Sequence, residues 1–446
     1  MVNTNVKIIE VLNSFLKIVI EKPEVRALYT TLPSDFTRNR KLPLKKIVGM
    51  LINLPKRSLS IKLQSFFESL DESDFCCTKG AFSLQRTKLK LIFFKIWNDL
   101  LIQSFYIFYG YDAKRWEGFR LLAVDGSNIN VINVPEVVDH FGSADNQFGG
   151  TPMGRVMQIH DVLNDLTIWG DIFPINCSKN AIIARQISSL PIDSLTLFDR
   201  GYPSFSLIYL LANEETSRHF LMRCRANFSN EVKGFVASKK KNLITTIYPS
   251  LESIKALRIH GYIVTKTTGI EVRMLKVVLP DGEIEVLLTN LYDKKIYSLK
   301  KMGKLYFMRW KIEIAYNKQK NQMQMEIFSG HRVICIEQDY AAGLFVANLQ
   351  SIVEKQCEQQ IKTISASRHY DYKINRNINL ATLKTRIIKL FIQSEDKKDT
   401  LEILMELQDL FVKNIEPVRP DRQAPRTLAK RKPGKYRTFT NYRRAI

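Results

Sequence analysis

Few cysteines and no long apolar runs occur in this sequence, and both shortages restrict what the protein can be. The six cysteines among 446 residues are scattered, without a Cys-x-x-Cys pair or a histidine cluster near them. A structural zinc site is therefore not expected, and the cysteines are expected as buried thiols in a reducing cytoplasm. The six histidines are unpaired, so none is predicted to bind a metal. Every apolar run is far shorter than the roughly 18 residues of a membrane-spanning helix.

Acidic residues are also scarce relative to basic ones. Asp and Glu number 44 against 67 Lys and Arg, which gives a formal net charge of +23. In a chain with 45% apolar residues, this imbalance indicates a folded protein with a polyanionic partner, and nucleic acid is favoured over an acidic membrane surface. The first 22 residues read as an amphipathic helix without a small-residue cleavage site, so no signal peptide is expected.

The spacing of apolar residues divides the chain into a helical region and a mixed region. Residues 1–110 show apolar residues at helical spacing and are predicted as a helical N-terminal region. Residues 111–225 alternate strands and helices: an apolar strand running into Asp125, a hairpin about Asn164-Asp165, and a second strand that ends at Asp199. A helix and a further strand follow. This order predicts a mixed α/β core.

The second half of the chain interrupts this core and then returns to helices. Residues 226–297 are predicted as a β-rich insertion with a hairpin about Asp281-Gly282. Residues 298–360 continue the core with helices, and residues 361–446 contain further helices and a basic tail. The final thirty residues hold ten Lys or Arg and one Asp.

One helical stretch, "LYFMRWKIEIAYNKQK" at 305–320, carries four polar residues at spacings that place them on one side of a helix. Arg309, Glu313 and Lys320 follow Tyr306 at offsets of three, seven and fourteen. On a regular α-helix these four side chains fall within an arc of about 60°. Taken alone, the stripe also fits a solvated helix face, because Arg309 and Glu313 form an ordinary i,i+4 pair.

Two aspartates stand where apolar strands stop. At Asp125 and Asp199 a buried strand is expected to fix the backbone while the side chain lies outside the core. The α/β folds hold their chemical groups at such strand ends. Taken singly, Asp125 also fits a turn-forming Asp-Gly pair, and Asp199 fits a helix or turn cap. Asp161, Asp165, Asp171 and Glu326 are interpreted as surface or turn residues.

Together, these residues resemble the bacterial insertion-sequence DDE transposases of the insertion-sequence-four family. The similarity rests on the Tyr-x2-Arg-x3-Glu-x6-Lys spacing, the strand-end Asp125 and the "DRGY" segment at Asp199. The resemblance implies a ribonuclease-H-like mixed-sheet core, interrupted by the β-rich insertion, in which Asp125, Asp199 and Glu313 are the catalytic residues and bind two Mg²⁺ ions, with Mn²⁺ as a substitute. It further implies DNA contacts by Tyr306, Arg309, Lys320, Arg200 and Tyr202.

The implied function is cut-and-paste transposition. The protein is expected to bind the double-stranded ends of its mobile element, cleave them by metal-dependent hydrolysis and join them to target DNA. Because two ends are cut in concert, a homodimer on paired ends is expected, in the bacterial cytoplasm at the nucleoid and without a membrane partner. No covalent protein nucleophile is needed, since water or a 3′-hydroxyl attacks the phosphate in line.

The sequence also leaves three alternatives and supports one further expectation. The alternatives are another ribonuclease-H-like nuclease, a catalytically inactive DNA-binding relative, and a basic membrane-surface protein. End recognition is expected in the N-terminal helices, whose basic residues fit a DNA contact and a solvated surface equally well. The basic residues concerned are Arg38, Arg40, Lys41, Lys45, Lys46, Lys56, Arg57 and Lys62, with Lys430, Arg431, Lys432, Lys435 and Arg437 in the tail.

Overall fold

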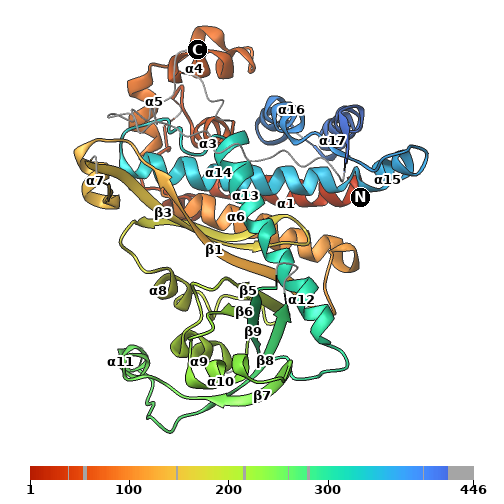
Figure 1. Ribbon diagram of the computed structural model, residues 1–446. Coiled ribbons are helices and arrows are strands. Elements are labelled where there is room, and N and C mark those ends of the chain that lie inside the picture. Colours follow the sequence, from red (N-terminus) through yellow and green to blue (C-terminus); the bar gives the residue numbers. More distant parts are fainter. Residues whose placement is uncertain are drawn as a thin grey trace.

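A computed structural model describes most of the chain (Figure 1). The described residues are 1–38, 40–53, 58–146, 149–213, 217–259, 261–278, 282–394 and 396–419, with only the backbone given at 145 and 146. Figure 1 shows long helices across the upper part of the molecule and the strands β5–β9 in the lower part. Lys56, Arg57, Asp281 and the basic tail beyond residue 419 lie outside the described residues.

The N-terminal helices form where apolar residues recur at threes and fours. They are α1 (Val2–Glu21), α2 (Pro23–Tyr29), α3 (Leu44–Ile52), α4 (Leu59–Glu68), α5 (Lys79–Arg86) and α6 (Ile92–Tyr109). On α1 the buried side chains include Val6, Ile9, Leu12 and Leu16, which form a single stripe. The predicted helical character of this region is confirmed.

A long helix from the other end of the sequence completes this helical layer. α14 (Val333–Lys355) is buried on nearly every side and packs on α6 and on strand β4. Trp97 of α6 stacks on Phe345 of α14 with ring centroids 4.1 Å apart. Arg86 at the end of α5 is 1% exposed and donates to Gln338 at 2.9 Å and to Asp339 at 3.0 Å on α14. The N-terminal helices are therefore fastened to α14 by packing and by a buried ion pair.

Nine of the described strands form one mixed sheet in the order β2-β3-β1-β5-β6-β9-β8-β7, with β4 paired to β3. β1 (Arg120–Asn130) lies parallel to β5 (Ser194–Phe198), which lies parallel to β6 (His219–Cys224). On the other side of β1, β3 (Gly149–Asp161) is antiparallel to it and forms a hairpin with β4 (Leu166–Pro174). The predicted hairpin about Asn164-Asp165 is present, and Asp165 adopts a φ of 56°. The sequence did not indicate α7 (Pro135–Phe141) and β2 (Ser143–Asn146), which lie between β1 and β3.

Residues 226–297 extend this same sheet. β9 (Ile284–Thr289) pairs antiparallel with β6, and β8 (Ile270–Val278) and β7 (Asn242–Ile247) follow outward. The strands agree with the predicted β-rich character, but the segment also contains two helices, α10 (Asn230–Ala237) and α11 (Leu251–Ile259).

The two faces of the sheet have separate cores. Leu122 and Val124 of β1 face a core with α8 (Lys179–Ala184), α9 (Phe205–Asn213), α10 and α11. Leu121 and Ala123 face the other core, with α12 (Leu299–Phe307) and α13 (Lys311–Asn317). This alternation is the period of two expected along a strand.

The helix that carries the Tyr-Arg-Glu-Lys residues differs from the regular α-helix that was predicted. After α12, a 3-10 turn spans Met308–Trp310, α13 follows, and a π-helical turn spans Lys318–Gln322. The 100° spacing behind the predicted arc therefore does not hold along the whole stretch. π-Turns of this kind occur frequently at functional sites.

The chain then adds α15 (Glu358–Ala366), α16 (Arg376–Ile388) and α17 (Lys397–Lys413), with a short ladder of β10 (Tyr372–Ile374) and β11 (Ile415–Pro417). All six cysteines are free thiols. None of the helices in the described part of the chain is long and apolar enough to span a membrane.

Candidate active site

The two predicted aspartates are neighbours on central strands, at the edge where the parallel β1–β5 ladder ends on its carboxyl side. In the parallel ladder of β1 and β5, Val124 lies opposite Phe198, and Asp125 and Asp199 come next along the chain. Asp199 directly follows the end of β5, as predicted, but β1 continues to Asn130, so Asp125 is not at the end of its strand. Both positions continue the alternation of Ala123 and Leu197, which face α12 and α13. Adjacent strands lie about 4.8 Å apart, so the two carboxylates emerge side by side on the face covered by these helices.

Asp125 is held inside strand β1 by three contacts. Its Oδ1 accepts the backbone N–H of Gly126 at 2.7 Å and lies 3.3 Å from Nζ of Lys179. Its backbone carbonyl accepts the hydroxyl of Tyr316 at 2.8 Å. The side chain remains 21% exposed. The Asp-Gly pair is therefore part of a strand and not a turn.

Asp199 follows the last residue of β5 and begins the turn that leads to α9. Its Oδ1 lies 3.4 Å from the hydroxyl of Tyr306, and its backbone carbonyl accepts the N–H of Tyr202 at 3.0 Å. The Tyr306 hydroxyl is also 3.4 Å from the carbonyl oxygen of Phe198. Burial raises the pKa of this phenol, and the negative charge of Asp199 adds to the effect while Arg309 opposes it.

Glu313 is connected to this edge through Arg309. The guanidinium donates to Oε1 of Glu313 at 2.9 Å. Arg309 is 3% exposed. Burial by itself lowers the pKa of its guanidinium, but Tyr306, Asp199 and Glu313 raise the pKa by more, so the pKa lies above its usual value. The arginine thus lies within electrostatic reach of two of the predicted catalytic carboxylates.

Lys320 and Glu326 attach the π-turn region to the far end of β1. Nζ of Lys320 donates to the carbonyl of Asn128 at 2.5 Å, and burial lowers the pKa of this lysine. Glu326 accepts the backbone N–H of Asn130 at 3.0 Å and its amide at 3.3 Å. The interpretation of Glu326 as a surface or turn residue was therefore incomplete, because this carboxylate supports the strand that carries Asp125.

Asp161, Asp165 and Asp171, which were also interpreted as surface or turn residues, differ in their environments. Asp161 is fully buried, not a surface residue, and accepts the N–H groups of Leu163 and Asn164 in the hairpin turn. Asp165 lies in the same turn, and Asp171 is paired with Lys95.

Tyr202 and Arg200 have opposite environments. Tyr202 is 2% exposed, and its hydroxyl has no hydrogen-bond partner among the described residues. Burial raises the pKa of this tyrosine, and the charges of Asp125 and Asp199 raise it further. Arg200 is exposed. Tyr202 is thus buried within electrostatic reach of the two aspartates, while Arg200 lies at the surface.

The carboxylates fit a divalent cation by type but not by their present arrangement. Asp and Glu oxygens are the hard ligands that Mg²⁺ prefers. However, no group of three or more His, Cys, Asp or Glu side chains close enough to hold a metal occurs in the described ranges. Asp125 is paired with Lys179, and Glu313 with Arg309.

Sequence reasoning did not identify three residues at this edge. Lys179 and Tyr316 carry no pattern that distinguishes them from other lysines and tyrosines. Glu285 at the start of β9 is 7% exposed and is paired with Arg223 at 2.9 Å. Burial raises the pKa of Glu285, and Asp199 lies close enough to add to this rise. Its contribution depends on the β6–β9 pairing, which no local signal predicts.

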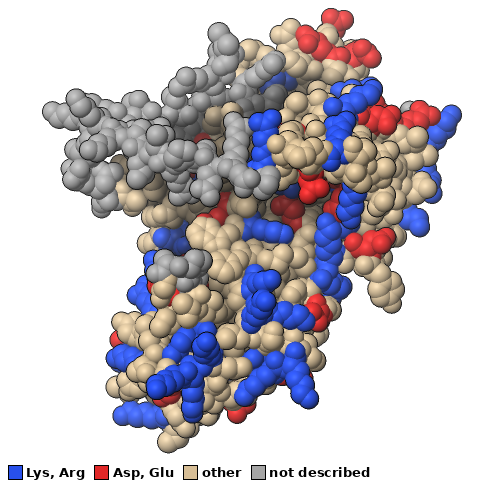
Figure 2. Space-filling model, turned by 45° about the vertical axis from the view of Figure 1, so that its right-hand side comes forward, with Lys and Arg blue, Asp and Glu red and all other residues tan. Residues whose placement is uncertain are grey.

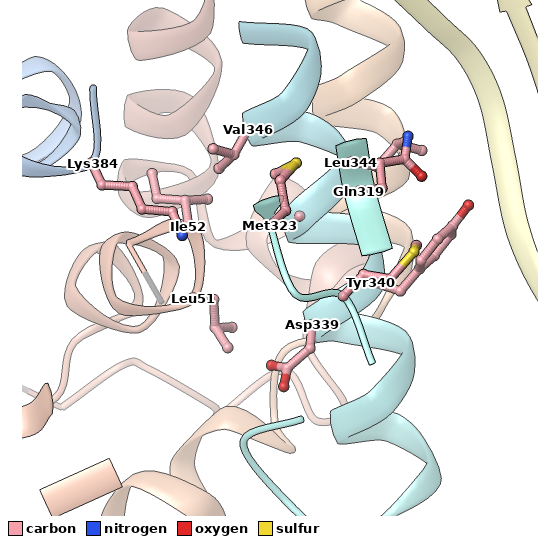
Figure 3. Close-up of a pocket in the computed structure, with 11 residues that line it drawn as sticks. Leu51, Ile52, Gln319, Met323, Asp339, Tyr340, Leu344, Val346 and Lys384 are labelled. Carbon is pink, nitrogen blue, oxygen red and sulfur yellow. The ribbon is translucent and has the colours of Figure 1, made fainter. Parts of the chain in front are cut away.

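Two features surround this edge. Behind the π-turn, a cavity of about 40 Å³ lies between Gln319, Met323 and α14, as Figure 3 shows.

Figure 2 shows Lys and Arg side chains gathered over the lower part of the molecule and along its middle, with fewer Asp and Glu among them. The face drawn there is suited to an anionic partner.

Comparison with known proteins gives sequence similarity to transposases. No family model matches the chain. It is 24% identical over 120 residues to "Putative transposase InsZ" of Escherichia coli (strain K12), covering 26% of this chain and 40% of that protein. It is 25% identical over 211 residues to "Transposase InsG for insertion sequence element IS4" of the same organism, covering 47% of this chain and 46% of that protein. The chain therefore matches less than half the length of either relative.

Among solved structures, the cryo-EM structure of the piggyBac transposase synaptic complex with hairpin DNA aligns with 90% of this chain and 84% of that chain. The TM-score is 0.39 and the sequence identity 10%.

Proposed function

We propose that the protein is a DNA transposase of the DDE type, which cleaves the ends of a mobile element and joins them to target DNA. The observation that carries this proposal is the position of Asp125, within β1, beside Asp199, which directly follows the parallel strand β5, on the face covered by the helix that bears Glu313. The sequence similarity to InsZ and InsG supports the same function. The Tyr-Arg-Glu-Lys spacing supports the finer assignment to the insertion-sequence-four family.

The strand order supports a ribonuclease-H-like core. Three strands, β1, β3 and β4, are antiparallel, and β5 and β6 then lie parallel to β1 on its other side. Asp125 belongs to the first strand of this group, and Asp199 follows the fourth. The acids thus occupy the edge at which such a core would hold its catalytic groups.

Mg²⁺, or Mn²⁺ in its place, is the proposed cofactor, and two bound ions would neutralise charge on the attacking and leaving oxygens of the phosphodiester. Asp125, Asp199 and Glu313 are the proposed ligands. Because Asp125 and Glu313 are each paired with a basic side chain, the ligand set requires a rearrangement of Lys179 or Arg309.

The remaining residues of the site have two proposed roles. Tyr306 and Tyr202 are buried around Asp199 and support its position, and in addition they are proposed to meet DNA after the site opens. The basic side chains of Arg309, Lys320 and Arg200 are proposed to bind phosphates, because guanidinium and ammonium groups form strong charge-assisted hydrogen bonds to them.

Element-end recognition is proposed for the N-terminal helices. An open groove of about 1400 Å³ lies between residues 40–46 and α5 and is lined by Arg40, Lys41, Leu84 and Gln85. Lys46 in this groove is paired with Glu72, and no ion pair between described residues includes Arg40 or Lys41. A groove with unpaired cations and exposed apolar side chains can contact both the backbone and the bases of DNA. In the full assembly, a homodimer at the bacterial nucleoid is proposed to hold two ends together.

One observation favours a second candidate, a DNA-binding relative without catalysis. The described acids do not assemble into a metal site. A cleavage assay on the protein's own element ends distinguishes the two functions. Purified protein with Mg²⁺ should cut these ends, and Asp125→Asn, Asp199→Asn and Glu313→Gln should each abolish cutting while end binding persists. Binding without cutting by the unaltered protein would favour the inactive relative, and normal cutting by any variant would remove that residue from the catalytic set.

A further inference from the structure

We propose that Lys179 is a positioning residue that takes the place of a divalent cation at Asp125 and must release this carboxylate before metal binds. This inference rests on the proposed function, because it takes Asp125 to be a metal ligand. It accounts for the disagreement between the residue types at this edge, which suit Mg²⁺, and their present arrangement, which does not hold one.

The ammonium group of Lys179 is placed at the end of the carboxylate. Nζ lies 3.3 Å from Oδ1 of Asp125 and 2.7 Å from the carbonyl oxygen of Gly126. Both partners are oxygens, and together they resemble part of the oxygen shell that a hard cation takes. The side chain of Lys179 is 38% exposed, so its head group borders solvent and can leave without unfolding its surroundings.

The residue after Asp125 leaves room for this arrangement. Gly126 lies within β1, and its missing side chain faces the core opposite α12 and α13. A Cβ atom there would lie 2.4 Å from Sδ of Met157 and 3.0 Å from Cε of Lys179. Only glycine therefore lets the lysine chain lie across the strand and reach Asp125 from the opposite face of the sheet.

The backbone of Lys179 is anchored more firmly than its partly exposed head group. α8 is anchored by the buried side chains of Ile182 and Ile183. The next residue, Asn180, donates from its amide to the carbonyl of Tyr202 at 3.1 Å. Since Tyr202 belongs to the turn that starts at Asp199, the beginning of α8 contacts both β1 at Asp125 and the turn after β5.

The charges determine the direction of the effect. An ammonium ion bound to Asp125 competes with a divalent cation for the same oxygen, so its removal should increase the affinity for metal. Once displaced by metal, the ammonium remains beside the acids, where a DNA phosphate is the next available anion. Loss of Lys179 should therefore tighten metal binding and yet slow cleavage, and a residue with only a packing role would not produce this combination.

The experiment measures Mn²⁺ binding to the full chain without DNA by isothermal titration calorimetry, and then cleavage of element ends at saturating Mn²⁺. Lys179→Met keeps an unbranched chain over Gly126 and removes the charge, whereas Lys179→Arg keeps the charge. Lys362→Met, at an exposed position on α15, controls for the loss of one positive charge. Asp125→Asn reports whether the measured binding involves Asp125, and thermal unfolding verifies that each variant is folded.

We expect Lys179→Met to bind Mn²⁺ about tenfold more tightly and to cleave more slowly, while Lys179→Arg and Lys362→Met stay near the unaltered protein. If Asp125→Asn loses binding but Lys179→Met does not gain it, the inference is wrong and the proposed metal site survives. If Asp125→Asn binds Mn²⁺ normally, the metal site and the inference both fail. Cleavage by Lys179→Met at the normal rate would overturn the phosphate contact.

Discussion

The hydroxyl of Tyr316 donates a 2.8 Å hydrogen bond to the backbone carbonyl of Asp125. The same phenol meets the backbone of Gln158, the residue opposite Asp125 in the β1–β3 ladder. Tyr316 is 5% exposed, and burial raises its pKa well above the usual range, so the hydroxyl stays protonated and can act as a donor. The helix bearing Glu313 is thereby connected to the strand bearing Asp125.

Tyr316→Phe should loosen this connection. The change removes one buried hydrogen bond and leaves the ring in place, so the free energy of unfolding should fall by about 1 kcal/mol. Cleavage should slow by a larger factor than this loss of stability implies, because Asp125 and Glu313 lose a shared support. Urea unfolding and single-turnover cleavage measure the two effects. Equal cleavage rates in both proteins would contradict this role for Tyr316.

Gly126→Ala should destabilise the protein because the new Cβ would overlap Met157. Overpacking of a core costs about 1–3 kcal/mol. The matched control is Gly234→Ala on α10, where a Cβ atom would have no neighbour within 4 Å. This control should stabilise the protein by up to about 1 kcal/mol, since alanine favours a helix more than glycine does. Thermal unfolding of both variants compares them, and a stable Gly126→Ala would show that Met157 and Lys179 shift without cost.

Asp165 should make the stability of the protein fall in acid. Burial by itself raises the pKa of this carboxyl, but Lys318, His160 and Arg376 outweigh it and hold the pKa well below its usual value. Arg376 contacts the carboxylate at 2.6 Å and Lys318 at 3.6 Å. A lowered folded-state pKa stabilises the protein above the unfolded pKa of about 4, and the contribution is lost as pH falls from there toward the folded value.

Asp165→Asn should therefore lower the free energy of unfolding at pH 7 by about 2 kcal/mol. Asparagine tolerates the positive φ of this turn, so the change tests the charge and not the backbone. Urea unfolding between pH 7 and pH 3 should show the gap between the two proteins closing below about pH 4. A gap of constant size across this range would exclude the carboxylate as its cause.

Arg40→Ala combined with Lys41→Ala should reduce the salt dependence of DNA binding. If each residue contacts one phosphate, the slope of log K against log salt should become less negative by about 2. The paired control Lys362→Ala with Lys413→Ala removes two exposed charges from the other end of the helical layer. Filter binding on element ends and on scrambled DNA at several salt concentrations gives both slopes. Equal slopes for the two double variants would place the phosphate contacts outside this groove.

The sequence was most informative where a short pattern determines structure. Apolar runs that stop at Asp125 and Phe198 predicted two strands. β5 ends at Phe198 as expected, whereas β1 continues past Asp125 to Asn130, because residues 125–130 pair with β3. Helical periodicity likewise predicted most of the N-terminal and C-terminal helices. Such elements follow from local burial, which composition and spacing reveal directly.

Other features depend on contacts between distant segments and could not be predicted. The 3-10 turn at Met308–Trp310 and the π-turn at Lys318–Gln322 fit the helix to β1, where Asn128 accepts a hydrogen bond from Lys320. The lysine at 179 meets Asp125 only because α8 folds across the sheet. Periodicity identified the residues on the helix but not the partners that each would contact.

The pairing of β9 with β6 also affects how this chain could change in length. The segment 226–297 is not a module attached by two linkers, because its strands continue the central sheet through backbone hydrogen bonds. Its removal would leave β6 with an unpaired row of N–H and C=O groups, the kind of edge that recruits other chains and causes aggregation. A shortened version of the protein would therefore need a new cover for β6, and soluble variants should keep β9 even where β7 and α11 are lost.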